Sequence, residues 1–141
     1  MDIYLKSVGP NHPHVGVLHN DIAVIYNAQG KFEKALEYIK NCLNLQLQAF
    51  GPEGPQSIMT MKNLGALYLR MKKLDEGQQY LEKAKSLAEK VFGEGHNNTA
   101  QCYEQLGVAY ERQGRINDAV ECYEKALRIN EKIFGKSILV Q

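Results

Sequence analysis

The feature that most constrains the fold of this chain is a glycine that returns every 42 residues, each time directly after an apolar residue. The four glycines are Gly9, Gly51, Gly93 and Gly135, and the residues before them are Val8, Phe50, Phe92 and Phe134. The sequence between them aligns without gaps as three copies, 9–50, 51–92 and 93–134. A fixed period of this length is typical of repeat proteins, in which each copy forms one unit and neighbouring units stack. We therefore predict one domain, 1–141, with three units.

Each copy carries two stripes of apolar and small residues at helical spacing. In the first stripe they are Ile22, Ala23 and Tyr26, then Leu64, Gly65 and Tyr68, then Leu106, Gly107 and Tyr110. In the second they are Ala35, Ile39 and Cys42, then Gly77, Leu81 and Ala84, then Ala119, Tyr123 and Ala126. Short turns separate the stripes, and Gly30 and Gly114 there suit the left-handed residue that ends a helix. Each copy is thus predicted to form two antiparallel helices, with the recurring glycine ending the second.

The pattern L-G-x-x-Y, as in Leu64 to Tyr68, followed by A-x-x-x-Y-x-x-A, as in Ala119 to Ala126, resembles the tetratricopeptide repeat. The 42-residue spacing, with GPNHPHV leading in and LRINEKIFG leading out, is similar to the kinesin light chain variant of that repeat. This resemblance implies an all-α, right-handed α-solenoid of three tandem helix-turn-helix units. Residues 1–8 then form the tail of a preceding helix, and 135–141 the start of a following repeat. Such ends indicate a piece of a longer array, or association end to end.

The second copy departs from the pattern at several positions. It has Gly77 where a small alanine is usual, and Lys73 in place of the turn glycine. Gly54 and Gln56 stand where the lead-in histidine and the residue after the proline would lie. Because a glycine inside a helix costs about 0.5 to 1 kcal/mol relative to alanine, we expect this copy to be locally looser.

Composition excludes several function classes. The net charge is only +1, so neither nucleic acid nor an anionic membrane is favoured as a partner. No run of about 18 apolar residues and no signal peptide is present, which indicates a soluble, cytoplasmic protein. The three cysteines, Cys42, Cys102 and Cys122, form no CxxC pair and lie inside helical patterns, so we interpret them as reduced packing residues.

Histidines form the densest group of candidate metal ligands, at His12, His14 and His19. We favour a helix-capping role instead, because His12 and His96 are two periods apart and both lie in a lead-in turn. His19 beside Asp21, or Cys42 with a histidine, could be imagined as a catalytic pair. However, no nucleophile elbow, phosphate loop or paired acids accompany them. We predict no enzyme, no cofactor and no metal.

What remains is a binding surface. In proteins that this chain resembles, the first helix of each pair lines a concave groove. Carried over by position, the resemblance implies a peptide-binding groove formed by fourteen residues. They are Asn20, Val24, Asn27, Lys62, Asn63, Ala66, Leu69, Arg70, Gln101, Glu104, Gln105, Val108, Glu111 and Arg112. Tyr26, Tyr68 and Tyr110 recur with the period and are interpreted as packing residues first.

One ligand class can be rejected within this resemblance. Modules that clamp the carboxylate of chaperone tails use Lys, Asn, Asn, Lys and Arg at five groove positions. These correspond here to Asn20, Val24, Asn63, Gln101 and Gln105, and only Asn63 matches. Without the cations, a terminal carboxylate would lose its hydration with little charge compensation.

The resemblance to kinesin light chains favours an adaptor that holds a mixed-charge extended segment or a partner helix. Lys62 and Arg70 could receive an acidic residue, and Leu69, Val24 and Val108 would supply apolar contact. Glu104 and Glu111 disfavour a uniformly acidic peptide. The alternative is a structural, self-associating or ligand-sensing segment of a larger regulatory protein, for example a repeat-sensing ATPase.

Overall fold

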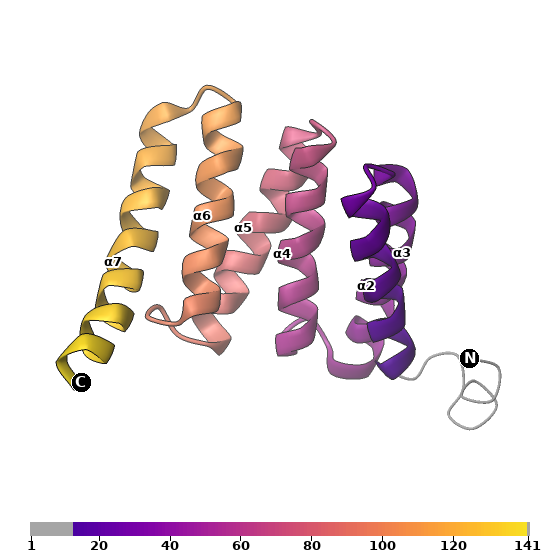
Figure 1. Ribbon diagram of the computed structural model, residues 1–141, viewed down its shortest axis with the longest axis horizontal. Coiled ribbons are helices and arrows are strands. Elements are labelled where there is room, and N and C mark those ends of the chain that lie inside the picture. The colour runs from indigo at the N-terminus through magenta and orange to yellow at the C-terminus, as the bar shows by residue number, and fades with distance from the viewer. Residues whose placement is uncertain (1–12, 141) are drawn as a thin grey trace. The chain divides into compact units, whose positions relative to one another are not determined.

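The computed structural model describes residues 13–140, and side chains within 14–135. These residues form six α-helices and no strand, as the repeat pattern predicts (Figure 1). The helices are α2 (Pro13–Ala28), α3 (Phe32–Phe50), α4 (Pro55–Arg70), α5 (Leu74–Val91), α6 (Asn97–Arg112) and α7 (Ile116–Val140). The helix tail predicted for residues 1–8 lies outside the described residues.

Glycines in the left-handed conformation end several helices, as their spacing predicts. Gly51 and Gly93 have φ of 77° and 96°, and Gly30 and Gly114 in the intra-pair turns have φ of 76° and 80°. A left-handed residue turns the chain away from the helix axis and lets the last carbonyls find amide partners. Gly51 does so directly, because its N–H donates to the carbonyl of Leu47 at 2.9 Å.

The helix starts follow from prolines and one histidine. Pro13 and Pro55 are the first residues of α2 and α4, where a missing N–H costs nothing. His96 precedes α6, and its Nδ1 accepts the N–H of Asn98 at 3.0 Å. The capping role predicted for the lead-in histidine is therefore confirmed at His96. His12 lies outside the described residues.

Two predictions about turn and stop residues are wrong. The left-handed residue in the second copy is Lys72, with φ of 65°, and not Lys73; Lys72 is the residue one period after Gly30. Gly135 does not end a helix, because α7 continues through it to Val140. Gly51 precedes Pro52, whose ring disfavours helical backbone before it, whereas Lys136 and Ser137 follow Gly135 and allow the helix to continue. That 135–141 begins a further repeat stays a prediction.

The chain divides into two compact units, Met1–Thr60 and Met61–Gln141. In the first, α2 packs against α3, and the small residues Ala23 and Ala35 are both buried. The rings of Tyr26 and Tyr38 stack with centroids 5.7 Å apart. The hydroxyl of Thr60 donates to Oε1 of the buried Gln46 at 2.5 Å. The packing role predicted for Tyr26 is confirmed.

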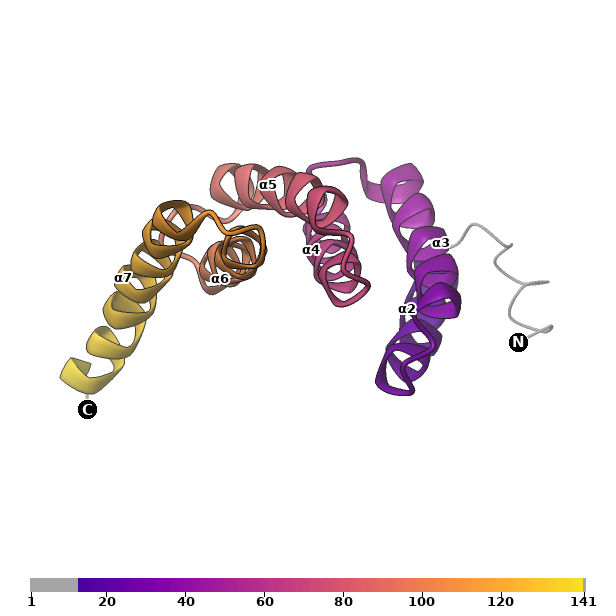
Figure 2. The same ribbon diagram turned by 90° about the horizontal axis from the view of Figure 1, so that it is seen from above.

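In the second unit, α6 packs against both α5 and α7. One apolar cluster joins them, and its buried members are Leu69, Leu81, Tyr103, Leu106, Ala109, Cys122 and Ala126. Tyr68 stacks on Tyr80 at 5.7 Å, and Tyr110 lies under the guanidinium of Arg115 at 4.4 Å. These contacts confirm the packing roles predicted for the recurring tyrosines. Figure 2 shows α6 nearly in end view, with α5 and α7 next to it.

The second copy is not looser at its glycines, contrary to the prediction. A Cβ atom at Gly77 would lie 2.7 Å from Cδ2 of Leu69, and one at Gly65 would lie 2.7 Å from Cγ of Leu81. At Gly54 a Cβ atom would lie 2.5 Å from Cβ of Phe50. These glycines stand where neighbouring atoms leave no room for a side chain, so the packing is closer there and not weaker.

Candidate functional site

The candidate site lies in the second unit, on the face that α6 shares with residues 61–70 of α4. Two hydrogen bonds join the helices along this face. Lys62 donates through Nζ to Oε1 of Gln101, and Arg112 donates to the carbonyl of Leu69 at 3.0 Å. We call this surface, from Lys62 and Gln101 to Arg70 and Arg112, the α4–α6 face. The two bonds hold the helices side by side over two to three turns.

Lys62 is the least exposed charged residue on the α4–α6 face. Its side chain is half-buried, and burial lowers the pKa of its amine, while nearby Cys102 and Glu104 act in the opposite direction. A partly desolvated ammonium attracts an anion more strongly than one in water, because less solvent screens it. One of its three donors is used by Gln101, so others remain for a ligand.

The acidic side chains point toward α7. Glu104 accepts from Nδ2 of Asn130 at 3.2 Å, and Glu111 accepts from the hydroxyl of Tyr123 at 2.9 Å. Both partners belong to α7, so the two carboxylates are directed toward that helix, with Glu104 still close enough to Lys62 to act on the pKa of its amine. The charge across the face therefore runs from basic at Lys62 to acidic beside α7.

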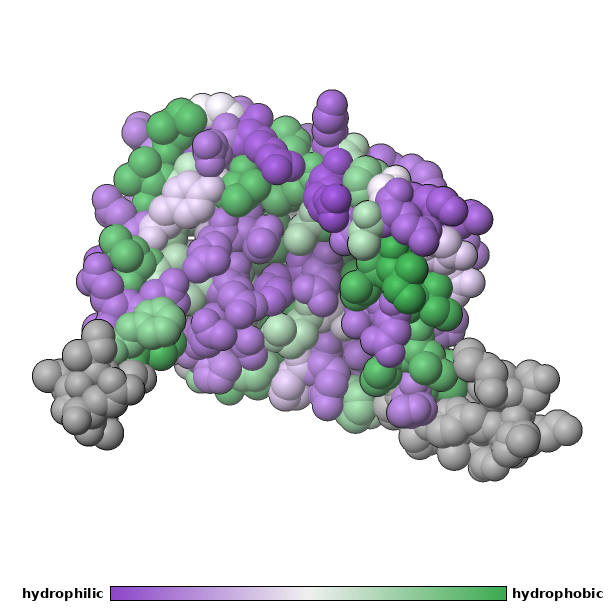
Figure 3. All heavy atoms as spheres, viewed as in Figure 1, coloured by the Kyte–Doolittle hydropathy of each residue, from purple (hydrophilic) through white to green (hydrophobic). Residues whose placement is uncertain are grey.

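Half-buried small and apolar side chains fill the middle of the face. They are Ala66 on α4 and Val108 on α6, with the amide of Gln105 beside them. Asn63 and Arg70 are exposed at the α4 edge. Figure 3 shows that hydrophilic side chains predominate over α6 and neighbouring α4. A ligand here would meet a shallow apolar strip bordered by polar groups.

Leu69 does not fit the prediction that it offers apolar contact to a partner. Its side chain is 2% exposed and packs in the core cluster with Leu81 and Leu106. The resemblance placed Leu69 on the correct helix, but its side chain points from α4 into the core and not toward the predicted groove. We therefore leave Leu69 out of the site. Its backbone carbonyl contributes instead, by accepting from Arg112.

The remaining predicted residues lie in the first unit, on α2. Val24 is 58% exposed, and Asn20 and Asn27 are half-buried. Their spacing of four and three residues places them on one side of that helix. Sequence reasoning missed Asn130 and Tyr123, which orient the two glutamates from α7. The resemblance considered only the first helix of each pair, so it could not include them.

Conventional catalytic groups are poorly placed in the described residues. Cys42, Cys102 and Cys122 are buried and free, as predicted, and burial raises the pKa of each thiol. A buried thiol of raised pKa is a poor nucleophile. Within the described residues, no three His, Cys, Asp or Glu side chains are grouped to hold a metal ion. None of the helices described is both long and apolar enough to cross a bilayer.

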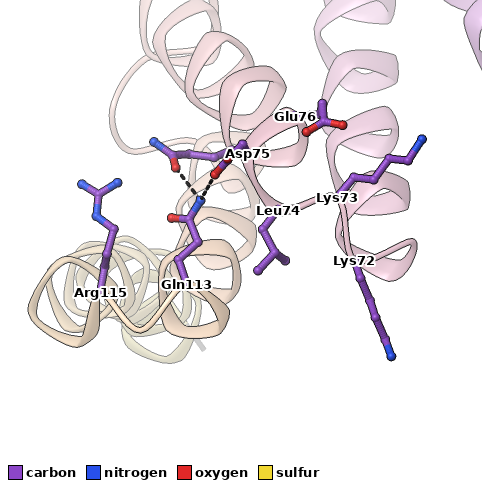
Figure 4. A pocket seen from close by; sticks show the side chains of 8 residues that line it. Lys72, Lys73, Leu74, Asp75, Glu76, Gln113 and Arg115 are labelled. Atoms are coloured by element: carbon purple, nitrogen blue, oxygen red, sulfur yellow. Dashed lines mark hydrogen bonds between the residues drawn. The ribbon is translucent and has the colours of Figure 1, made fainter.

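An open depression of about 680 Å³ lies at the turn end of the second unit (Figure 4). Gln113 donates there to Asp75 at 3.1 Å and to Gln78 at 2.8 Å, which ties the α6–α7 turn to the start of α5. Arg115 is paired with Asp118 at 2.9 Å. No predicted groove residue lines the depression, and its charged side chains are of both signs. We interpret it as a structural junction.

The family model described as tetratricopeptide repeat matches residues 14–76 and 57–132 of this chain. A comparison with curated proteins found no match. The two matched segments together span 14–132 and so include most of each of the three predicted copies.

Several solved structures share the fold. BtubC (BKLC) from P. vanneervenii is 24% identical with a TM-score of 0.85, over 95% of this chain and 54% of that one. A putative kinesin light chain with nearly identical repeats from Podosopora anserina is 22% identical with a TM-score of 0.79, over 94% and 62%. The N-terminal domain of stress-induced protein-1 from C. elegans is 22% identical with a TM-score of 0.66, over 83% and 85%. The predicted all-α repeat-solenoid class is confirmed, and this chain spans about half to three fifths of the first two.

Proposed function

Because the chain belongs to the tetratricopeptide repeat family, whose repeats mediate protein–protein interaction, we propose that it binds an extended peptide segment across the α4–α6 face. The supporting observation is the arrangement of charge on that face. The half-buried amine of Lys62 lies on one side, and two carboxylates held by α7 lie on the other. Between them lie the half-buried side chains of Ala66 and Val108, which offer an apolar contact surface.

The arrangement favours a peptide of mixed charge. An acidic residue would pair with Lys62 and Arg70, an apolar residue would lie over Ala66 and Val108, and a basic residue would approach Glu104 or Glu111. Such ordering gives specificity, because a peptide of the reverse charge order would place like charges together. Asn20, Val24 and Asn27 on α2 are proposed as a second patch for the same or another segment.

The protein would act as a non-enzymatic adaptor, similar in role to kinesin light chains, in the cytoplasm. Likeness to the kinesin light chain structures supports this, as do three free buried cysteines, which fit a reducing compartment. The rival function is a structural or ligand-sensing segment of a larger regulatory protein. A nucleotide-binding P-loop elsewhere in the same gene would favour the sensor, and a heptad coiled coil would favour the adaptor.

Selection from a displayed library of 12-residue random peptides tests the proposal. Selected peptides should carry an acid, an apolar residue and a base in that order. Lys62→Glu with Arg70→Glu should weaken binding of the selected peptides at least about tenfold in fluorescence anisotropy, since reversing two charges replaces attraction by repulsion. Helicity measured by circular dichroism should not change.

Lys83→Glu with Lys90→Glu is the matched control. It makes the same change of charge on α5, at two exposed lysines outside the α4–α6 face. Binding should survive in this control. Equal loss in both variants would mean that net charge drives binding, and undiminished binding in the Lys62 and Arg70 variant would contradict the proposed surface.

A further inference from the structure

The outer face of α7 carries a stripe of exposed apolar side chains. Ile116, Val120, Leu127 and Phe134 are 56%, 47%, 56% and 64% exposed, and Tyr123 between them is 36% exposed. Their spacing of three, four and seven residues places them along one side of a helix. Figure 3 shows hydrophobic side chains along the α7 edge. No described residue covers the stripe, and an apolar surface of this kind marks an interaction site.

The internal repeat shows what covers such a face. One period earlier, α5 has Leu74 and Leu81 where α7 has Ile116 and Tyr123. Leu81 is 0% exposed, because it lies against Gly65 of α4 and also in the core cluster with Leu106 and Ala109 of α6, and Leu74 packs partly buried against the same cluster. The face of a second helix is therefore covered by the first helix of a following unit.

The first helix α2 has the complementary exposed face. Ile25 is 59% exposed, whereas Ala109, two periods later, is 0% exposed where α6 meets α5. Leu67, one period after Ile25, is 3% exposed, so the position accepts a large apolar side chain. Figure 3 also shows hydrophobic side chains on α2.

Polar contacts of the α5–α6 junction have counterparts on the two exposed helices. At the α5–α6 junction, the hydroxyl of Tyr110 donates to Glu82 at 2.5 Å. The residue two periods before Tyr110 is Tyr26 on α2, and the residue one period after Glu82 is Glu124 on α7. A tyrosine hydroxyl and a carboxylate would thus meet again in the same register.

Two more pairs follow the same register. The hydroxyl of Tyr103 donates to Glu89 at 2.8 Å. The counterpart of Tyr103 on α2 is His19, and the counterpart of Glu89 on α7 is Glu131. Gln113 donates to Asp75, and the counterparts are Gln29 and Asn117. Tyr26 and His19 on α2, and Gln29 just after it, can each donate a hydrogen bond to the α7 counterpart, so the complementarity is polar as well as apolar.

We propose that the α7 stripe binds α2 of a second copy of this chain, in the register of the α5–α6 junction. The contact is head to tail: each copy offers α7 to one neighbour and α2 to another. Such a head-to-tail contact uses different surfaces on the two copies, so it adds copies one after another, in an open row or in a ring. The surface is separate from the α4–α6 face, since neither Ile25 nor Leu127 is one of the residues of that face.

Sedimentation of the chain at increasing concentration tests this. The unmodified chain should form dimers and larger species. Ile25→Asp and Leu127→Asp should each raise the dissociation constant at least about tenfold, because each buries a carboxylate in an apolar contact. Both side chains are more than half exposed in one copy, so the fold should be kept, with circular dichroism as the check. Val120→Asp replaces Leu127→Asp if helicity falls.

Mixing the two variants gives the sharpest result. Each retains one intact face, so an equimolar mixture should form a one-to-one heterodimer and nothing larger. Val17→Asp is the control, because Val17 is also an exposed apolar residue of α2. Its counterpart on α6, two periods later, is the half-buried Gln101, which bonds to Lys62 of α4 and not to α5. Its association should match that of the unmodified chain.

Three outcomes would overturn the proposal. The first is a chain that stays monomeric at all concentrations. The second is unaltered association of the Ile25→Asp variant, which indicates that α7 pairs with α7. The third is a mixture of the two variants that forms no heterodimer. Peptide binding is measured separately, so its loss or survival does not affect these results.

Discussion

Gly65 and Gly77 face each other across the contact of α4 and α5, and the position of a Cβ atom at Gly77 is 3.0 Å from the carbonyl oxygen of Gly65. The same position lies 2.7 Å from Cδ2 of Leu69. We predict that Gly77→Ala destabilises the protein by about 1 to 3 kcal/mol, because overpacking outweighs the gain in helix propensity. The midpoint of urea unfolding, followed by circular dichroism, measures this.

Gly135→Ala is the matched control for that prediction. Gly135 is also a helical glycine, but nothing lies within 4 Å of the position of its Cβ atom. Alanine there should leave stability unchanged or raise it by up to about 1 kcal/mol. If both variants were stabilised alike, the close approach of α4 and α5 would be wrong.

Lys72 is a second position where the backbone decides the outcome. With φ of 65° it is the one non-glycine residue of positive φ among the described residues. We predict that Lys72→Gly raises the free energy of unfolding by about 0.5 to 1 kcal/mol, because glycine adopts this conformation without a steric cost. Lys72→Ala keeps a Cβ atom and should give no such gain. Thermal unfolding of the three proteins side by side checks the order.

The period was enough to predict the helix pairs, the glycine stops at Gly51 and Gly93, and the capping histidine His96. These features depend on residues close in sequence, whose conformational preferences act locally. Gly77 was misjudged for the opposite reason. Its effect depends on Gly65 and Leu69, which lie on another helix, and helix propensity carries no information about that distance.

The candidate site shows the same division. Lys62 and Gln101 were both predicted for the groove, and the structure brings them into contact. Leu69 was placed on the wrong side, because a shift of one residue turns a side chain by about 100° around a helix. The partners of Glu104 and Glu111 lie on α7, and no local pattern pointed to them.

Stability should fall in alkaline solution. Burial raises the pKa of Cys102 from 9.0 to about 11. The nearby charge of Lys62 lowers this pKa, and that of Glu89 raises it further. The folded protein therefore holds the thiol proton more tightly than the unfolded chain does. This difference stabilises the fold fully below pH 9, and the stabilisation is lost as the pH rises toward 11. Two pKa units correspond to about 3 kcal/mol. Burial also raises the pKa of Tyr103 and Tyr110, in the same direction.

Urea unfolding at pH 8, 9, 10 and 10.5 measures that loss. Cys102→Ala removes one of the contributing groups, so its stability should decline less steeply with pH than that of the unmodified chain. The slope is the quantity to compare, because the substitution also changes packing. Equal slopes would show that the Cys102 thiol ionises in the folded protein at its ordinary pKa.

The buried pair of Thr60 and Gln46 in the first unit allows a test of hydrogen bonding by itself. Thr60→Val should cost about 1 to 3 kcal/mol, because Oε1 of Gln46 would stay buried without its donor. Gln46→Leu should also be destabilising, since the threonine hydroxyl would then lack its strongest acceptor. The double variant replaces both polar groups by apolar ones and should be nearly as stable as the unmodified chain. A double-mutant cycle from urea unfolding gives the coupling energy, and simple additivity of the two single changes would show that the bond does not form in solution.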